Sequence, residues 1–388
     1  MNMSGSITAV NTKQVHVAQI TTVHPPFDTR IFHKQAKTLA RAGYDVTLIA
    51  RHARDETIDG IRVAALPVPR NRLSRMFVLT WKAFREALRQ RADVYHIHDP
   101  ELLPMGVVLK LLTRKPVLYD IHENVLAQIR SKAWIPRALR PVMRLVYQMT
   151  EGALLRFADA IILAEDSYHP RYRGHGNCVI VHNYPIVSMR KKLPTAVAHA
   201  FRVVYVGGVS ELRGALTMAE AARVLKERDA DVQWAVIGPI QSDDFQQVLQ
   251  HTEIDVPGFK VIGALPFDEA QHAIANADVG LAVLKPVPNY VESLPTKLLE
   301  YMMAGIPVIA SDFPLWREIV EGNRCGLTVD PLDPRAIADA ICYLIEHPDE
   351  AVEMGRRGRQ AVEQKYNWRQ EEMKLLELYG SLLGGRGK

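Results

Sequence analysis

The segment NYVESLPTKLLEYMMAGIPVIASD (289–312) contains the residues whose types and spacing are best suited to chemistry. Glu292 and Glu300 lie eight residues apart in it. Eight helical steps of about 100° would bring the two carboxylates to within roughly one quadrant of the same helix face. Two acids on one face can belong to a ligand-binding site. The alternative is a surface helix with scattered charges, and the pattern alone leaves both interpretations open.

A helix is predicted from about Leu294 to Ala304. Ser293 can act as its N-cap, Pro295 suits the first turn, and Gly305 is a C-cap signal. The first backbone N–H groups of such a helix have no partner within it, so they form an anion site suited to a phosphate or diphosphate.

Lys297 would lie in the first turn of this helix. A cation there opposes the helix dipole by roughly 0.3–1 kcal/mol, and a bound diphosphate would reverse that sign. The unfavourable placement therefore points to a phosphate ligand.

Short apolar runs alternate with amphipathic helical stretches along the whole chain. Several runs lack polar alternation, which is typical of strands buried on both faces of a parallel sheet. Helical patterns lie between them, such as 30–42, which ends at Gly43. The predicted strands are 14–20, 45–50, 61–66, 94–99, 116–122, 160–165 and 178–183 in the first half, and 201–208, 232–238, 260–265, 279–284, 306–311 and 326–330 in the second.

A polar, basic stretch without clear periodicity at 186–200 separates the two sets of strands, and 335–384 contains helical patterns only. Strands alternating with helices on both sides of a linker predict two α/β units, each with a doubly wound parallel sheet. Such sheets bind ligands beyond the carboxyl ends of their strands, so we expect the active site in the groove between the two units.

Composition restricts the class of protein. The chain has 388 residues, 48% hydrophobic and 23% charged, which fits an ordinary globular protein of two or three domains. Its three cysteines, Cys178, Cys325 and Cys342, are unclustered, which argues against a thiolate metal site and indicates a reducing compartment. No apolar run reaches the roughly 18 residues that a membrane span needs. The first residues lack a signal-peptide pattern, so a cytoplasmic protein is expected.

Charge is distributed unevenly. Residues 1–198 contain 29 Lys and Arg against 15 Asp and Glu, whereas the remaining residues contain 19 against 28. The stretch 130–156 combines Arg and Lys with apolar residues, a pattern that can lie on an anionic membrane surface. Arg70, Arg72 and Arg75 form a second basic patch. A helix that faces its own core is the alternative, and no recognised nucleic-acid-binding module accompanies these patches.

The segment from Glu292 to Glu300, followed by LEYMMAGIPVIASD, resembles the Glu-x7-Glu signature of retaining glycosyltransferases of family 4, also called glycosyl transferases group 1. The resemblance covers nearly the whole chain. TTVHPPFDTRIFHKQAKTLARAGYDVTLIA is similar to the family's first strand, acceptor loop and helix, and VYHIHDPELLP and VLYDIHE are similar to its histidine-bearing strand ends. VIVHNYP resembles the end of the first domain, and VVYVGGVSELRG resembles the start of the second.

This resemblance implies the GT-B fold, in which two Rossmann-like doubly wound domains face each other across a cleft. The implied organisation is a disordered leader at 1–13, an acceptor-binding domain at 14–190, a linker at 191–200, a nucleotide-sugar-binding domain at 201–366, and a C-terminal helix at 367–388 that packs back on the N-terminal domain.

The resemblance also implies roles for individual residues. His122 is expected to be the catalytic-site histidine that contacts the donor sugar, with Glu292 beside that sugar and Glu300 on the ribose hydroxyls. The other expected donor-binding residues are Gly207, Gly208, Arg213, Gly263, Pro266, Ser293, Leu294 and Lys297, and the expected acceptor-binding residues are Asp28, Arg30 and His98. For Asp28 and Arg30 the alternative is that they pair with each other.

One departure from the family pattern concerns the diphosphate. Gly208 stands where the family usually has an arginine, and Arg213 stands where it has a lysine. We expect Arg213 to clamp phosphate oxygens through its guanidinium fork, and Lys297 to supply the missing cation.

No metal or other cofactor is expected. His96 and His98 alternate along a predicted strand, so we expect them to face opposite sides, which makes them a poor metal pair without a third ligand.

The resemblance thus implies a retaining hexosyl- or N-acetylhexosaminyl-transferase in bacterial surface polysaccharide biosynthesis, cytoplasmic or peripheral on the inner face of the plasma membrane. It would use a UDP- or GDP-sugar and act on a glycan or polyprenyl-diphosphate-linked acceptor. Two alternatives stay open. One is a nucleotide-sugar 2-epimerase of the same fold. The other is a non-catalytic nucleotide-sugar-binding subunit, which Gly208 would favour because a diphosphate cation is lost.

Overall fold

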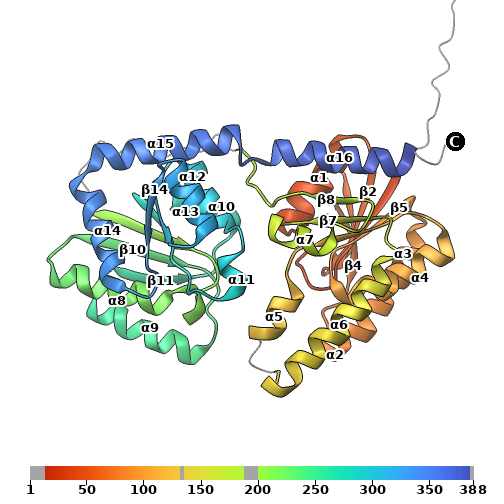
Figure 1. Ribbon diagram of the computed structural model, residues 1–388, viewed down its shortest axis with the longest axis horizontal. Helices are drawn as coiled ribbons and strands as arrows, with labels where there is room; N and C mark the ends of the chain where they lie inside the picture. Colours follow the sequence, from red (N-terminus) through yellow and green to blue (C-terminus); the bar gives the residue numbers. More distant parts are fainter. Residues whose placement is uncertain (1–13, 132–134, 188–199, 385–388) are drawn as a thin grey trace, which may run out of the picture. The chain divides into compact units, whose positions relative to one another are not determined.

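The computed structural model describes residues 14–131, 135–187 and 200–384. They form two compact units (Figure 1). The described residues of unit 1 are 14–126, 135–182 and 372–384, and those of unit 2 are 127–131, 183–187 and 200–371. The expected leader at 1–13 and nearly all of the expected linker at 191–200 lie outside the described residues.

The sheet of unit 1 is parallel except at one edge, where β3 pairs antiparallel with β4. Its strands lie in the order β3 (Glu56–Ile58), β4 (Ile61–Leu66), β2 (Asp45–Arg51), β1 (His16–Ile20), β5 (Val94–Ile97), β6 (Val117–Ile121), β7 (Ala160–Leu163) and β8 (Cys178–Ile180). Seven of these strands match the predicted runs. The three-residue strand β3 was not predicted, because so short a segment carries no detectable periodicity.

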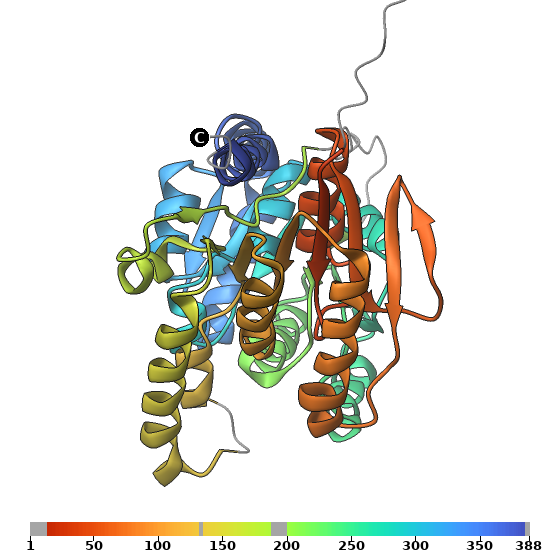
Figure 2. The ribbon, with the colours of Figure 1, turned by 90° about the vertical axis from the view of Figure 1, so that its right-hand side faces the viewer.

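Helices cover both faces of this sheet. The helices α3 (Thr80–Gln90), α4 (Leu103–Thr113) and α6 (Arg140–Leu155) lie side by side in one layer (Figure 2). The apolar core beneath them includes Tyr95 and Ile97 of β5. The other helical segments of unit 1 are η1 (Thr29–Ala36), α1 (Lys37–Arg41), α2 (Arg72–Ser74), η2 (Arg75–Leu79), η3 (Pro100–Leu102), α5 (Val125–Ser131, shared with unit 2), η4 (Arg137–Leu139), η5 (Asp166–Tyr168), α7 (His169–Tyr172) and most of α16 (Trp368–Gly384).

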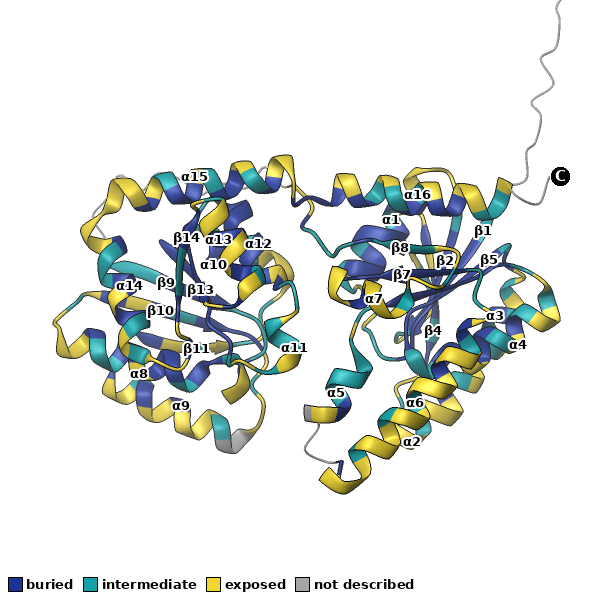
Figure 3. Ribbon diagram, viewed as in Figure 1, coloured by how far each residue is buried: buried dark blue, intermediate teal, exposed yellow. Residues whose placement is uncertain are grey.

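Unit 2 contains a six-stranded, fully parallel sheet. Its order is β11 (Phe259–Gly263), β10 (Val232–Ile237), β9 (Phe201–Val206), β12 (Val279–Ala282), β13 (Val308–Ser311) and β14 (Gly326–Val329). The central strands β12 and β13 are wholly buried between helical layers, whereas the edge strand β11 is partly exposed (Figure 3). The helices are η6 (Glu211–Arg213), α8 (Ala215–Glu227), α9 (Asp243–Asp255), α10 (Phe267–Ala275), α11 (Pro288–Val291), α12 (Thr296–Ala304), α13 (Pro314–Gly322), α14 (Pro334–Glu346) and α15 (Pro348–Gln364).

Both sheets reverse their strand order next to their first strand. In unit 1 the reversal lies between β1 and β5, and in unit 2 it lies between β9 and β12. Connections on the two sides of a reversal run in opposite directions, which leaves a crevice at the carboxyl ends of the strands. The prediction of two doubly wound α/β units is confirmed, and each unit has one position where its fold favours a ligand.

Candidate functional site

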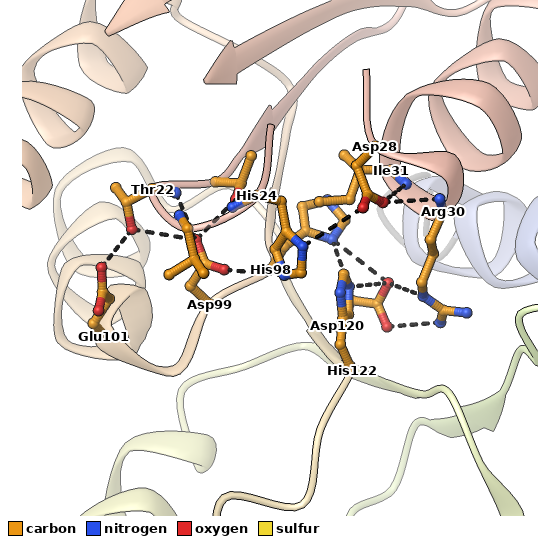
Figure 4. Close-up of polar contacts among 12 residues, drawn as sticks. Thr22, His24, Asp28, Arg30, Ile31, His98, Asp99, Glu101, Asp120 and His122 are labelled. Atoms are coloured by element: carbon orange, nitrogen blue, oxygen red, sulfur yellow. Dashed lines mark hydrogen bonds and ion pairs between the residues drawn. The ribbon is translucent and has the colours of Figure 1, made fainter. Parts of the chain in front are cut away.

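In unit 1, polar side chains gather where β1, β5 and β6 end (Figure 4). Asp99, just after β5, organises the turn after β1. Its Oδ2 accepts hydrogen bonds from the Thr22 amide at 2.5 Å, the Val23 amide at 3.1 Å and the Thr21 hydroxyl at 2.9 Å. His24 lies beside the same carboxylate, with Nε2 3.5 Å from Oδ1. A buried carboxylate thus fixes the loop that leads into the next helix.

Asp28 caps that next helix. Its Oδ1 accepts from the amides of Arg30 at 2.8 Å and Ile31 at 3.0 Å, and its Oδ2 lies 3.6 Å from Nδ1 of His24. Burial acts to raise the pKa of Asp28, but the contacts with His24 and the Ile31 amide outweigh it and hold that pKa far below its usual value. Burial likewise acts to lower the pKa of His24, and the carboxylates of Asp28 and Asp99 reverse the effect and raise it.

The alternative in which the side chains of Asp28 and Arg30 pair with each other is wrong. The Arg30 guanidinium pairs instead with Asp120 of β6, donating from Nε to Oδ2 at 2.9 Å and from a terminal nitrogen to Oδ1 at 2.8 Å (Figure 4). Its other terminal nitrogen donates to the Val181 carbonyl at 2.7 Å. Arg30 is only 3% exposed. The Arg30 guanidinium is therefore fully engaged within unit 1, and in this arrangement it is not available to bind an acceptor substrate.

Three histidine rings surround Asp120. His122 Nε2 lies 3.0 Å from Asp120 Oδ2, and His98 Nδ1 lies 3.5 Å from the same oxygen and 3.2 Å from His122 Nε2. The rings of His96 and His98 lie 4.3 Å apart, and His96 Nδ1 contacts the Tyr379 hydroxyl of α16 at 2.9 Å. The structure thus brings the predicted residues His98 and His122 together.

The interpretation that His96 and His98 face opposite sides is wrong. Side chains two residues apart along a strand point to the same face, so the two rings are neighbours. Together with Asp120 they offer one ligand atom each within 4.8 Å of one another, which makes them a candidate metal group among the described residues. The Arg30 cation already engages both oxygens of Asp120, however, and its charge opposes that of a metal ion.

In unit 2, the turn after β9 contains Gly207 and Gly208. Gly207 has a φ of +139°, a backbone conformation that residues with a side chain rarely adopt. A Cβ at this position would lie 2.9 Å from Nζ of Lys297 and 3.6 Å from Arg213. The nearest atoms to a Cβ on Gly208 also belong to Arg213, at 3.6 Å. Four of the predicted donor-binding residues therefore meet at this turn, although they come from segments about 90 residues apart in the chain.

Lys297 lies in the first turn of α12, and its side chain is buried there. The residue is 8% exposed, Nζ has no hydrogen-bond partner, and it lies 3.9 Å from the centre of the Tyr205 ring. Burial, together with the charge of Arg213, lowers the pKa of Lys297 well below its ordinary value, against an opposing contribution from Glu300. Within the described ranges no carboxylate forms an ion pair with Lys297 or Arg213.

The helix that follows begins later than predicted. α12 starts at Thr296 with Pro295 as its N-cap, and no side chain caps it. Ser293 is not the cap, because its hydroxyl donates to the Tyr290 carbonyl at 3.3 Å, and its own carbonyl accepts from Trp316 Nε1 at 2.7 Å. The end at Gly305, with a φ of +80°, is as predicted.

The shared helix face predicted for Glu292 and Glu300 is therefore wrong. Glu292 is exposed and ends the short helix α11, whereas Glu300 lies in α12 and is half-buried. Leu294, half-buried, belongs to the segment between the two helices. The eight-residue spacing thus spans a break between helices rather than two turns of one helix.

The turn after β10 packs against the glycine turn after β9, and the end of β11 in turn contacts the turn after β10. The carbonyl of Gly263, whose φ is +81°, accepts from the Gly238 amide at 2.7 Å. A Cβ on Gly238 would lie 1.9 Å from the Gly207 carbonyl. Gly263 therefore lies next to Gly238, one strand away from the turn of Gly207, whereas Pro266 lies beyond β11 as the N-cap of α10.

Sequence reasoning missed several residues of these sites. Asp99 and Asp120 are the central carboxylates of unit 1, and both lie in strand-end motifs that were interpreted only for their histidines. Tyr205 and Tyr301 flank the glycine turn: the Tyr205 hydroxyl donates to the Gly208 carbonyl at 2.8 Å, and the Tyr301 hydroxyl accepts from the Val206 amide at 2.9 Å. An acid within a buried strand was the signal that could have identified Asp120.

Two family models match the chain. One, described as "Glycosyl transferases group 1", matches residues 200–347, and the other, described as "Glycosyl transferase 4-like domain", matches residues 29–183. Among curated proteins, a glycogen synthase of Mycobacterium tuberculosis is 22% identical over 389 residues and covers 90% of each chain. The amylovoran biosynthesis glycosyltransferase AmsK of Erwinia amylovora is 26% identical over 180 residues, covering 45% of this chain and 44% of the relative.

Solved structures share the fold. A sucrose-phosphate synthase of Thermosynechococcus elongatus superposes with a TM-score of 0.76 at 21% identity, covering 96% of this chain and all of that one (100%). The Anabaena protein Alr3699/HepE in complex with UDP-glucose superposes with a TM-score of 0.71 at 15% identity, covering 95% and 100%.

Proposed function

This chain belongs to the family of group 1 glycosyl transferases, has the GT-B fold and is a glycosyltransferase; from that premise we propose that it transfers a sugar, with retention of configuration, from a nucleoside-diphosphate sugar to a hydroxyl of a glycan or lipid-linked glycan. The proposed setting is bacterial surface polysaccharide biosynthesis, and one relative is named as an amylovoran biosynthesis glycosyltransferase.

The observation that carries the proposal is the pair of cations at the glycine turn of unit 2. Lys297 is buried without a hydrogen-bond partner, and Arg213 lies against the same turn. A buried cation without a counter-charge is costly, so such a pair calls for an anionic ligand. A diphosphate fits, because its negative charge grows as the sugar leaves, and fixed cations stabilise that charge where it develops. The UDP-glucose complex of HepE supports this choice of donor.

The other residues of unit 2 take the roles that the family pattern gives them. Glu300 accepts hydrogen bonds from the ribose hydroxyls, and Glu292 lies beside the donor sugar. The uncapped amides at the start of α12 add hydrogen bonds to the diphosphate. Since Arg213 and Lys297 supply positive charge, we propose that the reaction requires no metal. From unit 1, His122 contacts the sugar, and Asp28 and His98 line the acceptor side.

Nucleotide binding tests the proposal most directly. UDP, GDP, ADP and dTDP are compared by thermal shift, and we expect one or two of them to raise the melting temperature, because a ligand that binds only the native state stabilises it. Lys297→Met is expected to abolish most of that shift. A protein that responds to none of the four diphosphates, at concentrations up to millimolar, contradicts the proposed donor class. Incubation with the donor alone separates the 2-epimerase alternative, which would form an epimer without an acceptor.

We also propose that unit 1 contacts an anionic membrane through α6. Only Glu151 and Leu155 of this 16-residue helix are buried. Glu151 anchors its C-terminal half by accepting from the hydroxyls of Tyr147 at 2.9 Å and Tyr172 at 3.0 Å and from Arg171. The exposed apolar side chains along the helix and just before it are Leu139, Val142, Met143, Leu145, Val146 and Met149.

The neighbouring helices have similar outer faces. Phe77 and Trp81 are exposed on η2 and α3, and Leu111 and Leu112 are exposed on α4. The segments 70–91, 103–115 and 137–156 contain 14 Lys and Arg against 2 Asp and Glu. Exposed apolar groups among basic ones fit an anionic lipid surface, where each basic residue contributes about 1 kcal/mol. No helix among the described residues is long and apolar enough to cross a membrane.

Vesicle co-sedimentation tests the membrane contact. We expect binding to vesicles with about one-third phosphatidylglycerol, where each basic group gains about 1 kcal/mol, and little binding to pure phosphatidylcholine. The double variant Leu145→Ser/Met149→Ser should lose most of the binding, and Ile254→Ser, an exposed apolar residue of unit 2, is the matched control. Self-association in light scattering, without vesicle binding, would show that a second copy covers this face instead.

A further inference from the structure

The buried Asp120 carboxylate contacts one ring nitrogen of His122. Asp120 is fully buried, whereas the His122 side chain is 10% exposed and reaches the surface of the site. Both polar contacts of the His122 ring, to Asp120 Oδ2 at 3.0 Å and to His98 Nδ1 at 3.2 Å, are made by Nε2. Among the described residues, Nδ1 makes no such contact.

We propose that Asp120 is a positioning residue: its carboxylate holds a proton on Nε2 of His122, so that the ring, when it carries one proton, presents the Nδ1 lone pair to the ligand. In this tautomer His122 accepts a hydrogen bond and does not donate one. This inference rests on the proposed function for the identity of the ligand alone. The ligand would be a hydroxyl of the sugar or of the acceptor, and it would donate a hydrogen bond to Nδ1.

The surroundings of Asp120 keep it ionised and therefore an acceptor. The Arg30 fork engages both oxygens, and Gln35 Nε2 donates to Oδ2 at 2.6 Å. Burial acts to raise the pKa of Asp120, but the Arg30 guanidinium, together with the hydrogen bond from His122, holds it well below its usual range. An ionised carboxylate can only accept, so the group facing it across 3.0 Å must donate.

His98 could also donate a hydrogen bond to Asp120, but it lies farther from the carboxylate than His122 does. Its Nδ1 lies 3.5 Å from Asp120 Oδ2, beyond normal hydrogen-bond range, whereas His122 Nε2 lies within it. Burial lowers the pKa of His98 to about 4, so near neutral pH this ring has no charge with which to displace His122. Its Nδ1 can instead accept a share of the His122 Nε2 proton at 3.2 Å.

The tautomer of His122 can be measured without any substrate. Long-range ¹H–¹⁵N spectra of the full chain labelled at histidine distinguish the Nε2–H form from the Nδ1–H form, and His122→Gln assigns the signal. We expect the Nε2–H form in the wild type. The Nδ1–H form would overturn the proposal, whether or not any variant folds.

Asp120→Asn provides the kinetic test. The amide carries no charge to hold the Nε2 proton, so we expect a mixed or Nδ1–H tautomer. We expect kcat to fall by about 10²–10⁴-fold, the range found when a histidine that acts in catalysis loses its orientation or its acid–base role. The KM for the donor should change less than about threefold, because the phosphate contacts of the donor lie in unit 2.

Asp159→Asn is the matched control, since Asp159 forms an ion pair with Lys110 and accepts from the Val117 amide at the other end of β6. It should leave the His122 tautomer and kcat unchanged. If a folded Asp120→Asn keeps both the wild-type tautomer and a kcat within threefold of wild type, Asp120 has only a structural role. If the tautomer is as expected but the wild type transfers no sugar, the proposed function fails and the positioning role stands.

Discussion

The polar sites of the two units differ in how their charges are balanced. In unit 1, the buried Arg30 cation is engaged by both oxygens of Asp120, and the carboxylates of Asp28 and Asp99 are engaged by amides and His24. In unit 2, Arg213 and Lys297 lie at the glycine turn without a carboxylate partner among the described residues. The first site is complete without a ligand, whereas the second has excess positive charge.

A transferase of this fold can thus use one unit to orient a side chain and the other to bind a diphosphate. A site that must hold a side chain in one orientation gains from internal hydrogen bonds, because they restrict its rotamer and tautomer. A site that must bind a diphosphate gains from cations that no protein group neutralises, because their attraction is then available to the ligand. The same kind of substitution should therefore have opposite effects on the stability of the two units.

The largest effect is expected for Arg30→Met in unit 1. Removing the cation leaves Asp120 buried with an uncompensated charge, which typically costs about 3–5 kcal/mol of the free energy of unfolding. Urea unfolding followed by circular dichroism measures the loss. Arg54→Met, at an exposed arginine of the same unit, is the control and should change stability by less than about 0.5 kcal/mol. Equal stabilities of the two variants would show that the buried pair contributes nothing.

The next largest effect is expected for Lys297→Met in unit 2, with the opposite sign for stability. The unliganded protein should become more stable or stay unchanged, since a buried ammonium without a partner is replaced by an apolar side chain of similar length. Nucleoside diphosphate binding should weaken about 10–100-fold, because a hydrogen bond to a charged group contributes about 1.5–3 kcal/mol. Titration calorimetry measures the affinity, and unchanged binding would remove Lys297 from the donor site.

The same lysine predicts a pH dependence. Its folded-state pKa is lowered, so between that pKa and the ordinary pKa of lysine the unfolded chain binds more protons than the native state does. The stability of the unliganded wild type should therefore rise with pH up to the ordinary pKa of lysine, and Lys297→Met should lack that contribution. Diphosphate binding should take up a proton, which is detected by calorimetry in buffers of different ionisation enthalpy. Binding without proton uptake would contradict the lowered pKa of Lys297 in the unliganded protein.

A smaller effect separates the two glycines of the turn. Gly207→Ala places a side chain at a φ of +139° and 2.9 Å from Lys297 Nζ. We expect a loss of about 1 kcal/mol of stability from backbone strain, and nucleotide binding about tenfold weaker because the ammonium is displaced. Gly208→Ala is the matched control: its Cβ would make only ordinary contacts at 3.6 Å with Arg213, so both properties should stay near wild type. Equal stability and equal nucleotide affinity of the two variants would show that the turn does not fit closely around Lys297.

The smallest effect concerns His24 in unit 1. Because its folded-state pKa is raised, its contribution to stability is complete below the unfolded value of about 6.5 and is lost as pH rises through the folded pKa. The stability difference between wild type and His24→Gln should therefore shrink from pH 6 to pH 9, by roughly 0.5–1 kcal/mol, since the pair is partly exposed. A difference that is constant across this range would show that the contacts of His24 with Asp28 and Asp99 are not ionic.

Local patterns in the sequence predicted the two α/β units and all of their strands except β3. Buried strands of a parallel sheet are apolar along their length, and this local property is visible in any short window. The resemblance of the strand-end motifs to the family, rather than any local periodicity, predicted His98, His122 and the turn at Gly207 as site residues. The start of α12 was missed by two residues, because a helix can begin at any of several acceptable caps in the run from Ser293 to Thr296.

Only the tertiary structure decided which of these groups meet. Arg30 and Asp120 are 90 positions apart, and His96 and Tyr379 are 283 apart. Nothing in the local pattern specifies such pairs, since periodicity reports the face of an element and not its neighbour. Lys297 is a further example. The sequence predicted its place at a helix start, but only the packing of the fold buries its ammonium without a hydrogen-bond partner.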